Sequence, residues 1–190
     1  KMGKIILASS SPRRADILKE SGYSYEIIPS PYEEQHTRAV FSYDYIIEQA
    51  YKKAKAGAKL LKEERTLVIG ADTMVVLDND ILEKPHSIKE ACDMLKRLSG
   101  RKHRVVTAIA VIQSSTGKNV TKAVTSDVEF YALTDEQIKN YVEKFKPLDK
   151  AGAYGIQELP EGFVKSYTGS LKNIIGLCPD ALSEMLEQFN

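Results

Sequence analysis

At 190 residues and 43% hydrophobic composition, the chain is long enough for one well-buried core, and we expect a single domain over residues 1–190. Its 27 Lys and Arg residues balance 26 Asp and Glu residues, so the net charge of +1 provides no global attraction to nucleic acid or to an anionic membrane. No apolar run approaches the roughly 18 residues of a membrane span, and no signal-peptide pattern is present, which together predict a cytoplasmic protein. Cys92 and Cys178 lie far apart without metal-ligand spacing, so we expect reduced thiols.

The N-terminal segment, residues 4–14, reads KIILASSSPRR and combines a short apolar strand with the start of a helix. Ser11 and Pro12 suit the N-cap and first position of a helix that we expect to end near Gly22. Arg13 and Arg14 then lie in the first turn, where the helix dipole disfavours cations. Free backbone N–H groups, serine hydroxyls and two guanidinium groups at one helix N-terminus predict a phosphate site, whereas the alternative is a solvated arginine pair.

The next region predicts a strand at residues 23–28, a polar segment and a second helix. Glu33 and Glu34 in the polar segment belong either to a solvated loop or to a metal-coordinating one, and the residues alone favour the solvated loop. Residues 42–61 have apolar side chains near helical spacing, which predicts an amphipathic helix. Lys53 lies near its apolar side, but without other information a solvated Lys53 is favoured over one that points inward.

Residues 66–77, TLVIGADTMVVL, predict a buried strand that carries Asp72 among aliphatic residues. Asp72 could be tuned as a base by its surroundings, or could accept hydrogen bonds from backbone amides at a bulge. The chain turns at residues 78–80 and returns through residues 81–85, which predicts a hairpin. A three-residue turn places Lys84 on the face of Asp72 at a diagonal of roughly 7–8 Å. A two-residue turn places the two side chains on opposite faces.

The second half of the chain predicts helices with clear N-terminal caps and a long antiparallel ribbon. The expected elements are a helix at 87–98, strands at 103–113 and 122–133, a helix at 134–145, a strand ending at 173–177 and a final helix from 179. Residues 149–157, DKAGAYGIQ, contain two glycines and several small residues, so the backbone there can approach a ligand closely. This composition is typical of a binding loop.

Five stretches, in order, resemble the Maf family: ASSSPRR at 8–14, GADT at 70–73, EKP at 83–85, SGRKH with VTA at 99–108, and DKAGAYGIQ at 149–157. The resemblance covers nearly the whole chain. It implies an elongated α/β fold of two lobes around a mixed, twisted β-sheet with flanking helices, and a nucleotide cleft between the lobes. It also implies hydrolysis of a nucleoside triphosphate to the monophosphate and pyrophosphate. The GADT and SGRKH stretches resemble the motifs of the family branch that acts on dTTP and UTP more than those of the branch that prefers 7-methyl-GTP.

Residue by residue, the resemblance assigns catalytic roles to Asp72, as proton acceptor, and to Lys84 and Glu34. The implied substrate-binding residues are Ser9, Arg13, Arg14, Lys53, Thr73 and Gln157, of which Thr73 and Gln157 match positions associated with base selection. The family implies a divalent metal cation, and hard oxygen ligands favour Mg²⁺ or Mn²⁺. We expect Glu34 to be a ligand of this metal, with Asp72 as the second.

The expected partner is a nucleoside triphosphate, with no stable nucleic-acid binding, no membrane, and a homodimer as an open alternative. A rival function is a nucleotide-binding regulator of cell division or septum formation without significant turnover. Asp72 favours the enzyme, because a carboxylate beside a triphosphate would repel the ligand of a pure binder. Thr73 and Gln157 can each offer a donor and an acceptor, which suits the imide edge of uracil or thymine.

Overall fold

The structure is a computed structural model that describes residues 3–32, 39–61 and 65–190. Its strands are β1 (Ile5–Ala8), β2 (Tyr25–Ile28), β3 (Leu67–Leu77), β4 (Asp80–Leu82), β5 (Lys102–Gln113), β6 (Asn119–Phe130) and β7 (Val164–Thr168). Its helices are α1 (Pro12–Glu20), α2 (Tyr43–Ala58), α3 (Ile88–Leu98), α4 (Asp135–Phe145), α5 (Leu171–Ile175) and α6 (Pro179–Glu187), with 3-10 turns η1 (Ala151–Ala153) and η2 (Ile156–Glu158). No helix in these described ranges has both the length and the apolar character needed to cross a membrane.

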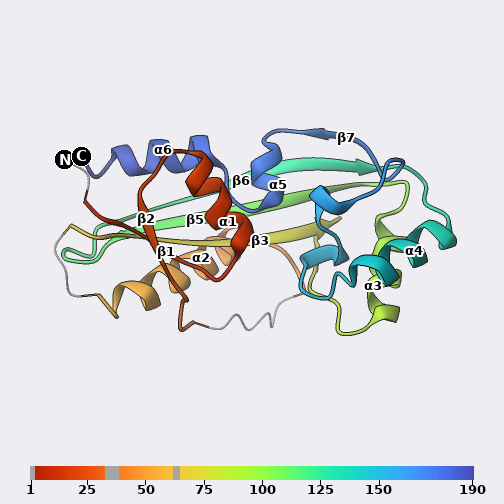
Figure 1. Ribbon diagram of the computed structural model, residues 1–190, viewed down its shortest axis with the longest axis horizontal. Helices are drawn as coiled ribbons and strands as arrows, with labels where there is room; N and C mark the ends of the chain where they lie inside the picture. The colour runs from red at the N-terminus through yellow and green to blue at the C-terminus, as the bar shows by residue number, and fades with distance from the viewer. Residues whose placement is uncertain (1–2, 33–38, 62–64) are drawn as a thin grey trace.

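One mixed sheet of seven strands runs along the elongated molecule (Figure 1), which confirms the predicted α/β class. The strand order is β2-β1-β3-β5-β6-β7, and β4 pairs with β3 outside this order. β1 pairs in parallel with β2 and β3, whereas β3, β5 and β6 form a long antiparallel ladder. The long strands extend between two groups of helices: α1, α2 and α6 pack near one end, and α3 and α4 pack near the other.

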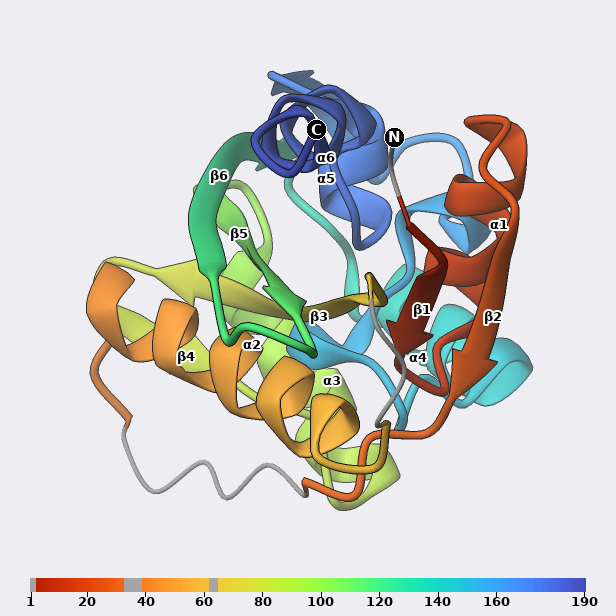
Figure 2. The ribbon, with the colours of Figure 1, turned by 90° about the vertical axis from the view of Figure 1, so that its left-hand side faces the viewer.

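The hydrophobic core is divided by the alternation of side chains along the central strands. Ala108 and Ala110 of β5 pack in the cluster that α2 covers, whereas Ile109 and Val111 pack in the cluster that α1 and α6 cover. Figure 2 shows α2 and α6 on opposite faces of the sheet. A third cluster, built by α3, α4 and the far ends of the strands, fills the other end. The predicted amphipathic helices are therefore used on both faces and at both ends.

The predicted helix starts are confirmed by their capping contacts. Ser11 Oγ accepts a hydrogen bond from the Arg14 backbone N–H at 3.4 Å, and Thr134 forms a complete capping box with Gln137. At the start of α3 a capping box is only half formed: Ser87 Oγ accepts from the Glu90 N–H, but the Glu90 carboxylate accepts from the His86 N–H at 2.6 Å.

The turn between β3 and β4 differs from the three-residue turn on which one predicted register depended. Leu77 pairs with Asp80, so the turn has two residues, and Asp78 adopts a left-handed φ of 60°. Strict alternation from this register would place Lys84 on the face opposite Asp72. However, β4 ends at Leu82, so alternation no longer determines the direction of Lys84, which lines the same cleft as Asp72.

The predicted strand ending at residues 173–177 is wrong. The strand in this region is β7, and residues 171–175 form the short helix α5. Ser170 caps this helix by accepting a hydrogen bond from the Asn173 N–H at 3.1 Å, and Gly176 ends it with a φ of 147°. The apolar, β-branched residues Ile174 and Ile175 resemble a strand, but the serine before them and the glycine after them determine the local structure.

Helix α2 and strand β3 approach each other closely at Gly70. A Cβ atom at this position would lie 2.5 Å from the carbonyl oxygen of Ala50 and 2.5 Å from the backbone nitrogen of Ala54. Only a residue without a side chain permits this backbone contact. The approach places Lys53 of α2 beside the part of β3 that carries Asp72.

Candidate active site

A cleft of about 740 Å³ lies between the α1 N-terminus, β3, the segment after β4, and residues 149–158. Every predicted site residue that the structure describes lines it: Ser9, Arg13, Arg14, Lys53, Asp72, Thr73, Lys84 and Gln157. Glu34, the predicted metal ligand, lies outside the described residues, as does Glu33. We call residues 9–14, 53, 72–73 and 84 the phosphate wall, and residues 149–158 the loop wall.

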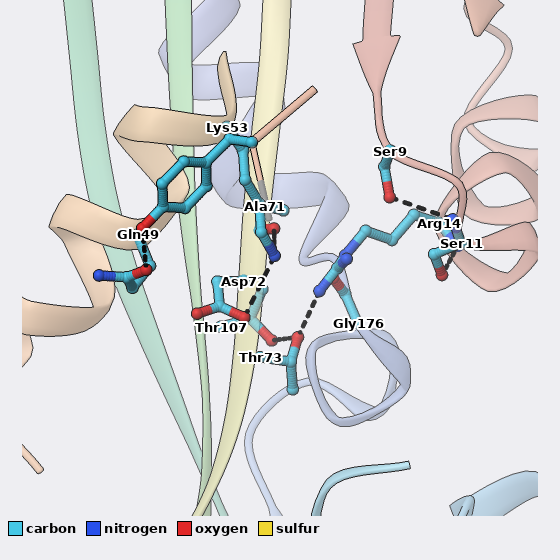
Figure 3. Close-up of polar contacts among 11 residues, drawn as sticks. Ser9, Ser11, Arg14, Gln49, Lys53, Ala71, Asp72, Thr73, Thr107 and Gly176 are labelled. Atoms are coloured by element: carbon cyan, nitrogen blue, oxygen red, sulfur yellow. Dashed lines mark hydrogen bonds and ion pairs between the residues drawn. The ribbon is translucent and has the colours of Figure 1, made fainter. Parts of the chain in front are cut away.

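The phosphate wall begins where β1 delivers the chain into α1. Ser9 is buried, and its hydroxyl oxygen accepts a hydrogen bond from the Ser11 N–H at 3.1 Å (Figure 3). Because that contact uses an acceptor of Ser9, its hydroxyl proton is left to donate to an anion. Arg13 and Arg14 follow in the first helical turn, so the local sequence places hydroxyl, amide and guanidinium donors at one edge of the cleft.

Asp72 forms the acidic centre of the phosphate wall and is paired with Lys53. The Lys53 ammonium donates to the Ala71 carbonyl oxygen at 3.1 Å and to Asp72 Oδ1 at 3.4 Å. The Asp72 side chain is only 4% exposed, and its second oxygen, Oδ2, has no hydrogen-bond partner among the described residues. An unsatisfied buried carboxylate oxygen is costly, so Oδ2 is a strong candidate to contact a bound ligand or water.

Positive charge is concentrated around this carboxylate. Burial lowers the pKa of Lys53 to about 8; Asp72 opposes this shift, and the nearby charges of Arg14 and Lys84 add to it. Burial likewise lowers the pKa of Arg14 to about 10, again opposed by the charge of Asp72. Around Lys53, the charges of Arg14 and Lys84 add to its own and Asp72 offsets one of them, so this part of the cleft suits an anionic ligand.

The side chain of Arg14 is held in place by contacts from distant parts of the chain. Its Nε donates to the Gly176 carbonyl oxygen at 2.8 Å, and its Nη2 donates to Thr73 Oγ1 at 3.0 Å (Figure 3). Thr73 Oγ1 also lies 2.8 Å from Thr107 Oγ1 on the neighbouring strand. The hydroxyl of Thr73, predicted to read the base, is therefore already engaged within the protein. Its contact with a base stays a prediction.

The loop wall contains residues that belong to the sequence motifs but have no role predicted from them. Lys150 is 11% exposed and pairs with Asp149 at 3.2 Å and with Glu158 at 3.6 Å. Tyr154 lies in the cleft lining, and its buried hydroxyl is 2.6 Å from His103 Nε2. Burial lowers the pKa of His103 to about 4, so this imidazole is neutral at physiological pH. The motifs SGRKH and DKAGAYGIQ therefore meet in space, a contact that neither motif predicts alone.

The donor atoms of the cleft suit a divalent metal held jointly with a substrate. No cluster of three or more metal-ligating side chains occurs among the described residues. Mg²⁺ commonly uses only one or two carboxylates, completing its shell with water and substrate phosphates. Asp72 Oδ2, buried and unpartnered within the described chain, provides one such oxygen.

Comparisons with known proteins converge on one family. The sequence model of the family described as "Maf-like protein" matches residues 4–189. A dTTP/UTP pyrophosphatase of Bdellovibrio bacteriovorus is 39% identical over 188 residues, covering 97% of this chain and 98% of that protein. The dTTP/UTP pyrophosphatase of Vibrio vulnificus strain YJ016 is 39% identical over 188 residues, covering 99% and 100%. That of Escherichia coli O157:H7 is 40% identical over 190 residues, covering 100% and 94%.

Proposed function

Because this chain belongs to the Maf family, we propose that it is a nucleoside triphosphate pyrophosphatase. It hydrolyses the α–β phosphoanhydride bond and releases a nucleoside monophosphate and pyrophosphate. This chain aligns with nearly the whole length of its relatives named dTTP/UTP pyrophosphatase, which supports dTTP and UTP as substrates.

The observation that carries this proposal is Asp72, a buried carboxylate with one oxygen that has no partner among the described residues, in a cleft that Arg13, Arg14, Lys53 and Lys84 also line. A pure receptor for a triphosphate gains nothing from such a group, because its charge repels the ligand. A hydrolase needs it, because a carboxylate can orient a water molecule and accept its proton during attack on phosphorus. Lys53 holds the carboxylate through Oδ1, so both lone pairs of Oδ2 remain, one to accept that proton and one to contact a cation.

The cations of the phosphate wall bind the triphosphate and stabilise its leaving group. A triphosphate carries about four negative charges, and Arg13, Arg14, Lys53 and Lys84 of the phosphate wall offset them. The same groups neutralise charge that develops on departing pyrophosphate, so they act in the ground state and the transition state. A divalent cation held by Asp72, and by Glu34 as we propose, would supply Lewis-acid polarisation of the phosphate oxygens.

Base selection is assigned to the loop wall together with Thr73. Gln157 is exposed in the cleft and has both an amide donor and an acceptor, which suits the imide edge of uracil or thymine. A 5-methyl group changes binding by about 1–3 kcal/mol at most, so dTTP and UTP should both be accepted. We expect both to react faster than CTP, ATP and GTP, with 5-modified pyrimidine nucleotides also hydrolysed.

The proposal is tested with purified protein, Mg²⁺ or Mn²⁺, and a panel of canonical, 5-modified and 7-methylated triphosphates. The expected products are the monophosphate and pyrophosphate, with dTTP and UTP giving the highest kcat/KM. Preference for 7-methyl-GTP would overturn the choice of substrate but keep the chemistry. Nucleotide binding without any pyrophosphate release would overturn the proposed enzymatic activity and would favour the rival function, a nucleotide-binding regulator of cell division.

We also propose that residues 1–190 act as one domain in the cytoplasm, with no stable nucleic-acid partner. The balanced charge of the sequence supports the last point. Cell fractionation tests the location, and gel-shift assays with DNA and RNA test the partner. Light scattering decides between a monomer and the alternative homodimer.

A further inference from the structure

Two threonine hydroxyls connect the phosphate wall to a backbone carbonyl group in helix α5. Arg14 Nη2 donates to Thr73 Oγ1 at 3.0 Å, and Thr73 Oγ1 lies 2.8 Å from Thr107 Oγ1. Thr107 Oγ1 in turn donates to the Asn173 carbonyl oxygen at 2.9 Å. Thr107 is fully buried, so it cannot contact a nucleotide in the cleft.

The chemistry of the end groups gives this chain of hydrogen bonds one direction. A carbonyl oxygen only accepts, so Thr107 uses its single hydroxyl proton on Asn173. Thr73 must then donate its own proton to Thr107, which turns a lone pair of Thr73 toward Arg14. A guanidinium has donors only, so this lone pair is the group that Arg14 requires.

The far end of the chain is firmly anchored. Asn173 is fully buried, and its side-chain Nδ2 donates to the Val124 carbonyl oxygen at 3.0 Å and to Ser126 Oγ at 3.1 Å. These bonds fasten α5 to β6. The end of the same helix supplies the second contact of Arg14, because Gly176 accepts from Arg14 Nε at 2.8 Å.

We propose that Thr73 and Thr107 are positioning residues that orient the Arg14 guanidinium toward the phosphates of the substrate. This inference rests on the proposed pyrophosphatase function and deepens it. Two of the five N–H donors of Arg14 are used on Thr73 and Gly176, which leaves three for phosphate oxygens. Because Thr73 has spent its only proton on Thr107, it cannot donate to a carbonyl oxygen of the base. The part of its role that acts through Arg14 is therefore the same for all nucleotides, because Arg14 contacts the phosphates and not the base.

The test compares Thr107→Val, which breaks the chain, with Thr107→Ser, which keeps the hydroxyl. Thr66→Val is the matched control, because Thr66 is also buried but its hydroxyl has no hydrogen-bond partner in the described part of the chain. Thr107→Val should lower kcat/KM by about 10- to 100-fold for UTP and for GTP alike, since a misplaced binding group costs rates of this order. Thr107→Ser should restore kcat/KM to within about threefold of the original protein, and Thr66→Val should leave it unchanged.

A double-mutant cycle separates positioning from general stability. In an Arg14→Ala background, Thr107→Val should lower kcat/KM by no more than about threefold further, because the group that it orients is gone. An equal loss in both backgrounds would overturn the proposal. A change in the UTP-to-GTP ratio of kcat/KM in Thr107→Val would also overturn it, since Thr107 is buried away from the base and acts only through Thr73 and Arg14. If Thr107→Val fails to fold, Thr73→Val in the same cycle decides.

A binding measurement with pyrophosphate tests the positioning of Arg14 without requiring that any triphosphate be hydrolysed. Calorimetry of the original protein with pyrophosphate and Mg²⁺ should give a Kd that rises about tenfold in Thr107→Val and not in Thr66→Val. This result would stand even if no triphosphate were hydrolysed. An unchanged Kd, or no binding of pyrophosphate by the original protein, would overturn the role given to Arg14 and its two threonines.

Discussion

The two walls of the cleft are held in place by different kinds of contact. In the phosphate wall, Arg14 bonds to a carbonyl group 162 positions away in the sequence, and Lys53 to a carboxylate 19 positions away. In the loop wall, Lys150 pairs with its neighbours Asp149 and Glu158, and the backbone closes two tight turns on itself.

The difference indicates where positional accuracy matters. Charged groups that stabilise a transition state must be fixed before the substrate arrives, and bonds to the sheet and to α5 provide this. The loop wall, which we propose to contact the base, is held mainly by local contacts, so it can adjust when a base binds. A buried hydrogen bond between Tyr154 and His103 of β5 joins the loop wall to the sheet.

The most severe way to disable the phosphate wall is Asp72→Asn. The amide keeps the shape and hydrogen bonding but cannot accept the proton of the attacking water, so kcat should fall by roughly 10² to 10⁴. Nucleotide affinity should be retained or increased, because one negative charge has been removed. Steady-state kinetics and calorimetry measure the two effects. Undiminished kcat would transfer the role of base to Glu33 or Glu34.

A smaller loss is expected when the geometry of one cation changes but its charge does not. Arg14→Lys keeps the positive charge, but a lysine cannot bond Gly176, Thr73 and phosphate together, so kcat/KM should fall about 10- to 100-fold. Arg13→Lys is the matched variant in the same helical turn and should lose less. Equal losses in the two variants would contradict the view that Arg14 is held more strictly.

The pH dependence of kcat/KM should report the buried lysine of the phosphate wall. The pKa of Lys53 is lowered to about 8, so this lysine is charged below pH 8 and neutral above it. kcat/KM should therefore fall as pH rises through about 8, because a charge that binds phosphate is lost. In Lys53→Arg the guanidinium stays charged, so the fall should move to higher pH. A profile that is identical in both proteins would assign the transition to another group.

The mildest effect is expected in the loop wall. Tyr154→Phe removes one buried hydroxyl and leaves His103 Nε2 without its partner, which should lower the free energy of unfolding by about 1–3 kcal/mol. KM for UTP should rise about 2- to 5-fold while kcat changes less, because the loop wall, as we propose, binds the base equally in the ground state and the transition state. Urea denaturation and initial rates test this. A fall in kcat with unchanged KM would place the loop in the chemical step.

Local sequence rules predicted the parts of the site that adjacent residues determine. The start of α1 follows from Ser11 and Pro12 alone, and the buried strand around Asp72 follows from its aliphatic neighbours. Both features depend on contacts within a few residues, which a sequence displays directly.

The remaining parts depend on contacts that only the folded chain makes. Lys53 points inward because α2 lies against β3, which its own helical pattern does not reveal. The turn at Asp78 and Asn79 has two residues because Asp78 accepts a left-handed backbone, a choice that composition leaves open. The helical form of α5 does not follow from its own residues, because Ile174 and Ile175 favour a strand. This segment supplies the Gly176 carbonyl that binds Arg14 and the Asn173 carbonyl at the end of the threonine chain. Neither contact can therefore be predicted without the helix.

The contact at Gly70 links the electrostatics of the site to the packing of the core. With any side chain there, α2 would have to move away by about 1 Å to restore ordinary van der Waals separation. Lys53 would move with the helix, and its attraction to Asp72 would weaken with distance. The strength of the Lys53–Asp72 ion pair thus depends on Gly70, a residue without charge or side chain that lies two positions before Asp72. Residues 53, 70 and 72 cannot vary independently, and a change that looks like simple repacking of an apolar interface would alter the charge balance of the cleft.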